Sequence, residues 1–308
     1  MKTLSRAAFQ DAISFVKEKG RDLDRALLAY HFEDGAADEV LAALAAYQND
    51  DGGFGHGLEP DLRTSASSVI ATTVAFQNFR SLGVPAEHPL VRRGLDYLLE
   101  TYDESRQVWP IIPPEVEDAP HAPWWDYASS EAGFGGFLSN PRVEIVGYLH
   151  DYCAVVPADL LESVTTAVFA HLDSLPDEME MHDLICFVSL AETAALPQSR
   201  KDRIWEKIAK AAELGVAREP EQLTGYVLKP LYVVSSPDAP LAEQFAEEVA
   251  MNLDFEIEQQ GADGAWSPNF SWGDQHPEAW EIAKREWQAR ITLKNLRVLR
   301  DFDRIETG

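Results

Sequence analysis

Apolar side chains recur along this chain at spacings of three and four residues, which is the period of one buried helix face. Clear runs begin at Phe9, Val40, Phe245 and Leu293, and further helical runs lie near 22–32, 66–82, 88–100, 142–153, 158–173, 181–195, 200–213 and 276–289. The alternating pattern of a β-strand is missing, and prolines interrupt the one extended segment, Val108–Pro114. The sequence therefore predicts an all-α fold.

Two segments, Leu41–Gly55 and Leu253–Ser267, align at a shift of 212 residues. In each, a helical run is followed by a glutamine, a polar spacer, Asp-Gly and an aromatic residue, in the pairs Gln48/Gln260, Asp51/Asp263, Gly52/Gly264 and Phe54/Trp266. Weaker echoes are Leu98–Trp109 and Gly133–Phe137. The Asp-Gly step supplies the positive φ of a tight turn, and repeated helix pairs must stack to bury their apolar faces. We therefore expect both aromatic residues to be buried at equivalent turns.

These turns resemble the Gln–Trp repeats of squalene/hopene cyclases and protein prenyltransferase β subunits. Taken as repeat plus helix content, the resemblance covers most of the chain. It implies an α/α toroid, a barrel of inner and outer helices around a central cavity, as one domain over residues 1–308. The Asp-x-Asp-Asp and Asp-Asp-x-x-Asp motifs of terpene cyclases and synthases are absent. The resemblance is one of architecture and leaves open whether the chain is an enzyme.

The densest group of polar residues follows the first glycine-rich turn. His56, Glu59, Asp61 and Arg63 lie within eight positions, just before a predicted helix. The resemblance places this segment at the mouth of the cavity. We expect Glu59 or Asp61 to act as general acid or base, His56 to assist, and Arg63 to orient a polar group of the substrate. The alternative is a structural loop in which Asp61 pairs with Arg63 and Glu59 with backbone amides.

Tryptophans mark a second group of substrate-binding candidates. His121 precedes Trp124 and Trp125 in a segment stiffened by two prolines. Two adjacent tryptophans cannot both be buried on one face of a regular element, so one is expected to line a pocket or stack on a ligand. The alternative is a lid-like cover that packs on the fold. Trp272, in a loop, is a further candidate, followed in second rank by Asn140, Glu144 and Tyr226.

A metal site has one weak set of candidate ligands. His182 and Cys186 are four residues apart on a predicted helix, with Asp183 between them, and this spacing can supply two zinc ligands. The sequence identifies no third ligand. We therefore expect no metal and no other cofactor, and a helix-facing histidine beside a buried cysteine is the alternative.

Composition limits which partners, crosslinks and cellular location we expect for this chain. Asp and Glu number 52 against 26 Lys and Arg, a formal net charge of −26, so we expect neither nucleic acid nor anionic membranes as partners. Two cysteines exclude a disulfide framework. The chain shows neither a long apolar run nor the apolar core of a signal peptide, so we expect a cytoplasmic protein without stable membrane insertion. The oligomeric state stays open.

Three functions fit these residues. The first is an enzyme similar to terpene cyclases and prenyltransferases, which binds a small, partly apolar molecule such as an isoprenoid against a wall of Trp124 and Trp125. The second is a carbohydrate-active enzyme on an α/α barrel, of glycoside hydrolase or lyase type, because paired carboxylates and exposed tryptophans also suit a sugar. The third is a toroid that serves as a non-catalytic binding or scaffold protein.

Overall fold

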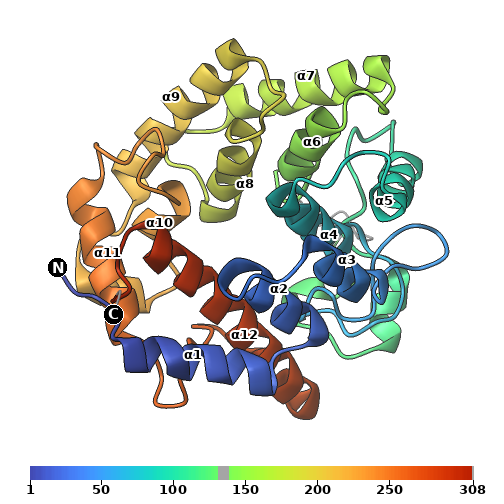
Figure 1. Ribbon diagram of the computed structural model, residues 1–308. Helices are drawn as coiled ribbons and strands as arrows, with labels where there is room; N and C mark the ends of the chain where they lie inside the picture. The colour runs from blue at the N-terminus through green and yellow to red at the C-terminus, as the bar shows by residue number, and fades with distance from the viewer. Residues whose placement is uncertain (131–138, 307–308) are drawn as a thin grey trace. The chain divides into compact units, whose positions relative to one another are not determined.

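The computed structural model describes residues 1–130 and 139–306, and Figure 1 labels their helices in chain order. These residues form twelve α-helices and three short 3₁₀ helices and contain no β-strand, so the predicted all-α class is confirmed. None of the described helices combines the length and apolar character needed to cross a lipid bilayer.

The chain divides into two compact units. Unit 1 comprises Met1–Ala43 and Gly215–Gly308, and unit 2 comprises Leu44–Leu214. The toroid and the single domain over 1–308 concern how such units are arranged, and both stay predictions.

Unit 1 is built from both ends of the chain. Its helices are α1 (Arg6–Lys19), α2 (Asp22–Phe32), η3 (Pro220–Thr224), α10 (Pro230–Val233), α11 (Ala246–Glu258) and α12 (Pro277–Asp301), and α3 (Ala37–Ala45) crosses its boundary in sequence. Helix α1 begins where the Ser5 hydroxyl accepts a hydrogen bond from the Ala8 amide, and it packs against α2 and α12 (Figure 1). Leu4 joins the two chain ends, donating to the Arg304 carbonyl (2.7 Å) and accepting from the Glu306 amide (3.0 Å).

Unit 2 is organised around helix α6. Its helices are α4 (Val69–Leu82), α5 (Pro89–Glu100), η1 (Pro114–Asp118), η2 (Pro123–Trp125), α6 (Arg142–Asp151), α7 (Ala158–Ser174), α8 (Met181–Ala191) and α9 (Gln198–Gly215). Helix α6 packs against α4, α7 and α8. The Arg80 guanidinium of α4 donates to the Asp151 carboxylate of α6 (2.7 Å) and to the Thr193 hydroxyl just after α8 (3.0 Å). One side chain thus ties three helices together.

The first copy of the repeated turn lies in unit 2. The Gln48 side-chain amide donates to the carbonyl of Gly52 and to that of Leu90 in α5, both at 2.9 Å. Phe54 is buried, and its backbone amide donates to the Thr72 hydroxyl of α4 (3.0 Å). Gly52 has φ +87°, as the turn requires. The glutamine therefore closes the turn and fastens it to the start of a helix.

The second copy, in unit 1, makes the same bonds. The Gln260 side-chain amide donates to the carbonyl of Gly264 and to that of Ala8 in α1, both at 2.8 Å. Trp266 is buried, its backbone amide donates to the Thr292 hydroxyl (3.1 Å), and Gly264 has φ +86°. The prediction of two buried aromatic residues at equivalent turns is confirmed.

Of the two weaker echoes of the repeated turn, the described residues include only Leu98–Trp109. The indole of Trp109 donates to the Leu98 carbonyl (2.6 Å), much as the indole of Trp266 donates to the Glu256 carbonyl (2.7 Å). The Gly133–Phe137 echo lies outside the described residues. In the Leu98–Trp109 echo, the indole is thus bonded to a carbonyl of the preceding helix, as the Trp266 indole is in the second copy of the turn.

Candidate functional site

Two loops of unit 2, far apart in the sequence, pair through their backbones. We call residues 52–63 the glycine loop and residues 114–130 the tryptophan loop. Leu62 and His121 form an antiparallel bridge, with the Arg63 amide donating to the Pro120 carbonyl (3.0 Å) and the Ala122 amide to the Asp61 carbonyl (2.9 Å). The two groups that the sequence picks out as site candidates therefore lie against each other.

The glycines let the first loop fold this tightly. A Cβ on Gly55 would lie 2.3 Å from the Ala66 carbonyl oxygen, a distance that no side chain tolerates. Gly57 has φ +74°, and a Cβ there would lie 3.1 Å from the Arg63 guanidinium carbon. Glycine at position 55 lets the loop backbone approach the backbone of Ala66, and glycine at position 57 lets the Arg63 side chain lie against the loop backbone.

The pairing holds two carboxylates away from water. Glu59 is 7% exposed and Asp61 is 3% exposed. Leu62, next to Asp61, is buried in an apolar cluster with Ile111 and Val116. Removing a carboxylate from water is costly unless other groups compensate it, and both residues have interaction partners. Two such groups within three residues are therefore unusual for a loop.

The other predicted residues of this region take different positions. His56 is exposed, and its Nε2 lies 2.8 Å from the Asn49 side-chain oxygen, where it supports the turn. Arg63 is half-buried. Trp124 is 39% exposed, whereas Trp125 is half-buried and packs against the Leu62 cluster. The two tryptophans thus lie in different surroundings, one partly in solvent and one against the apolar cluster.

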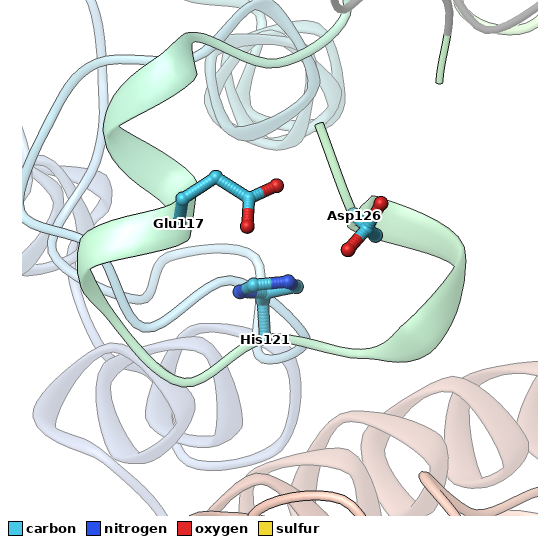
Figure 2. Close-up of side chains that lie close together, drawn as sticks. All are labelled: Glu117, His121 and Asp126. Atoms are coloured by element: carbon cyan, nitrogen blue, oxygen red, sulfur yellow. The ribbon is translucent and has the colours of Figure 1, made fainter. Parts of the chain in front are cut away.

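The tryptophan loop also gathers a histidine and two carboxylates. Glu117, His121 and Asp126 each place one potential ligand atom within 4.8 Å of the others, and Figure 2 shows the three side chains around a common space. His121 is 7% exposed, and Asp126 is half-buried. Glu117 is exposed, and its Oε1 accepts from the Tyr127 amide (2.6 Å). The carboxylates therefore come from opposite ends of one short loop.

Hydrogen bonds fix the chemical state of this group. The Nδ1 of His121 lies 2.8 Å from the Ala119 carbonyl oxygen, which can only accept, so Nδ1 carries a proton, and in the neutral form of the ring the lone pair is on Nε2. Hydrogen bonds from the Ser129 hydroxyl and amide, with His121 nearby, hold the pKa of Asp126 below its usual value. Asp126 is therefore an anion at neutral pH.

The helix that carries His182, Asp183 and Cys186 is less suited to a metal. His182 Nδ1 lies 2.7 Å from the Glu180 carboxylate, at the start of α8. Cys186 is buried, and burial raises the pKa of its thiol well above the usual value, which disfavours the thiolate that binds metals. The set of three potential ligands that the described residues do form lies in the tryptophan loop instead.

The remaining predicted residues are spread over both units. In unit 2, Asn140 is half-buried ahead of α6, and the Glu144 carboxylate of α6 accepts from the Tyr148 hydroxyl (2.5 Å). In unit 1, Tyr226 is exposed. Trp272 lies in a loop, as expected, but it is fully buried, so a ligand reaches it only if that loop moves. Glu144 has a clear structural role in linking two turns of its helix.

Sequence reasoning missed Glu117 and Asp126 as potential ligands. The only signal was their spacing around His121, four residues before and five after, in a proline-rich segment. Comparison with protein-family models and with curated proteins finds no match to this chain.

Proposed function

We propose that this chain is an enzyme of the α/α-toroid type that binds a small, partly apolar molecule and uses Glu59 and Asp61 as acid and base. One observation carries the proposal: both carboxylates are buried in a loop that is paired with the loop of Trp124. A water-poor site disfavours the charged form of a carboxylate, so such a site can keep one carboxyl group protonated as the acid while the other serves as the base. A loop with only a structural role has little need of two buried acids.

The aromatic residues support an apolar or cationic reacting group. The face of a tryptophan ring attracts positive charge, including the charge that develops in a carbocation. Trp124 has 39% of its surface exposed, so part of its ring can meet a ligand. The Arg63 side chain, beside Gly57, supplies a fixed positive charge to the same loop. An isoprenoid with a polar head group combines the features that these residues recognise.

A carbohydrate is the second candidate, favoured by a specific observation. Trp124 is exposed on the same loop as the carboxylates of Glu117 and Asp126. An open aromatic face beside acidic oxygens suits the stacking and hydroxyl recognition of a sugar ring, and glycoside hydrolases use pairs of carboxylates. A scaffold that binds neither ligand is the outcome in which both enzyme proposals fail.

Thermal unfolding with ligand panels tests the proposal. Isoprenoid diphosphates, isoprenoid alcohols and oligosaccharides are added to the full chain and to the variants Glu59→Gln, Asp61→Asn and Asp50→Asn. Asp50 is an exposed acid just before the glycine loop, so its variant is the matched charge control. A ligand present at 100 times its Kd stabilises the folded state by about 2.7 kcal/mol.

We expect an isoprenoid to stabilise the wild type and Asp50→Asn, and to stabilise the two site variants much less. Far-ultraviolet circular dichroism should show that both site variants keep their helices, since the amides preserve side-chain shape. If Glu59→Gln and Asp61→Asn both unfold the protein, the loop is a structural brace. Stabilisation by oligosaccharides alone selects the second candidate, and the absence of any stabilising ligand leaves the scaffold.

A further inference from the structure

We infer that Glu117, His121 and Asp126 form a binding site for one divalent metal ion, with Zn²⁺ as the best-matched ion. The inference does not depend on the proposed reaction, because it concerns a separate set of side chains and its test measures binding. It departs from the sequence-based expectation of no metal. That expectation considered His182, Asp183 and Cys186, whereas the folded tryptophan loop brings a different set together.

The spacing of the three groups is close to that of a bound ion. Their ligand atoms lie within 4.8 Å of one another. Zinc holds nitrogen and oxygen ligands at roughly 2.0–2.2 Å, which places neighbouring ligands about 3.4 Å apart in a tetrahedron. Figure 2 shows the three side chains around one space, so small movements of Glu117 and Asp126 that keep their hydrogen bonds to backbone amides can close the difference.

His121 is oriented as metal-binding histidines usually are. Its Nδ1–H donates to the Ala119 carbonyl at 2.8 Å, which fixes the ring and selects, for the neutral form, the tautomer with its lone pair on Nε2. A backbone carbonyl on the second ring nitrogen is the common outer partner of such a ligand. The ring is 7% exposed and is anchored by the backbone bridge to Leu62, so the nitrogen is held by the fold.

In each of the two carboxylates, one oxygen accepts a hydrogen bond from a backbone amide. Glu117 Oε1 accepts from the Tyr127 amide (2.6 Å), and Asp126 Oδ1 accepts from the Ser129 amide (2.7 Å). A carboxylate has about four lone-pair sites, so these bonds leave each group able to take a cation. One imidazole and two carboxylates favour Zn²⁺ over the all-oxygen sites that Mg²⁺ and Ca²⁺ prefer. Three protein ligands leave a fourth position for water.

Competition with a chromogenic chelator tests the site. The full chain is stripped of metal and titrated with Zn²⁺ alone, in the wild type and in Glu117→Gln, Asp126→Asn and Glu115→Gln. In Glu117→Gln and Asp126→Asn, the new side-chain oxygen can still accept from the backbone amide of Tyr127 or Ser129. The loop therefore retains these two hydrogen bonds. Glu115 is an exposed acid on the same 3₁₀ helix, outside the group, and its variant controls for the loss of one negative charge.

We expect one equivalent of Zn²⁺ per chain in the wild type and in Glu115→Gln, and an affinity at least about tenfold lower in the two ligand variants. The nuclear magnetic resonance signals of the wild-type His121 ring should shift on addition of Zn²⁺, a readout that needs no variant. The inference is overturned if no saturable binding occurs, if Glu117→Gln binds as tightly as the wild type, or if Glu115→Gln weakens binding equally. A shift of His182 signals in place of those of His121 also overturns it.

Discussion

Replacing Gly52 by alanine tests the repeated turn of unit 2. Gly52 has φ +87°, and a Cβ there would lie 2.3 Å from the Arg93 carbonyl oxygen. The left-handed backbone costs about 1–2 kcal/mol for alanine, and forcing a methyl group into packed chain costs about 1–3 kcal/mol more. Alanine recovers about 0.4–1 kcal/mol by restricting the unfolded chain. We expect the free energy of unfolding to fall by about 3 kcal/mol, within a range of about 1–5 kcal/mol.

Gly83 provides the matched control, because it shares the backbone conformation without the close approach. It has φ +63° at the end of α4, and no atom lies within 4 Å of a Cβ placed there. Gly83→Ala should therefore lose only about 1 kcal/mol. The same comparison exists in unit 1, where Gly264 (φ +86°) approaches the Asp11 backbone at 2.5 Å and Gly273 (φ +62°) has open space.

Guanidinium denaturation followed by circular dichroism measures all four variants. If the two units unfold in separate transitions, Gly52→Ala should shift one and Gly264→Ala the other. The reasoning is refuted if Gly52→Ala and Gly83→Ala agree within about 0.5 kcal/mol, because the close approach would then carry no cost.

Two further predictions concern one half-buried ionisable side chain in each unit, His31 in unit 1 and Arg80 in unit 2. Burial, with Arg297 nearby, lowers the pKa of His31 to about 4, so between pH 6.5 and 4 the unfolded chain binds a proton that the folded chain does not. The free energy of unfolding should therefore fall as pH falls through this window, and less steeply in His31→Gln. Arg80→Ala leaves the Asp151 carboxylate without its 2.7 Å partner and should lower the free energy of unfolding by about 2–4 kcal/mol in urea. Arg92→Ala, an exposed change on α5, should lower it by less than about 0.5 kcal/mol.

Sequence patterns predicted the helices and the repeated turns because these depend on local rules. The apolar spacing at Phe9–Val16 reports one face of α1, and Asp-Gly reports the positive φ of Gly52 and Gly264 in the two repeated turns, whereas at Asp34-Gly35 the positive φ falls on Asp34. Two predicted runs, 276–289 and the one beginning at Leu293, are a single helix, α12. Periodicity alone does not show whether neighbouring runs are continuous.

The candidate site was predictable only in part. Glycine spacing and charge density identified Glu59 and Asp61, and adjacent tryptophans identified the second segment. The bridge between Leu62 and His121 joins residues that no local pattern links, so the contact required the folded chain. Glu117 and Asp126 escaped notice because ligands in an irregular loop follow no fixed period.

The central claim is that the glycine loop and the tryptophan loop form one site, and amide hydrogen exchange tests it most directly. The amides of Arg63 and Ala122 donate across the pair, to the carbonyls of Pro120 and Asp61. Both should exchange far more slowly than in the unfolded chain, also in Asp61→Asn, since the bond uses the backbone carbonyl. A ligand or Zn²⁺ that binds there should slow both amides together. Exchange of either amide at the rate of the unfolded chain, or slowing of one without the other, contradicts a single site.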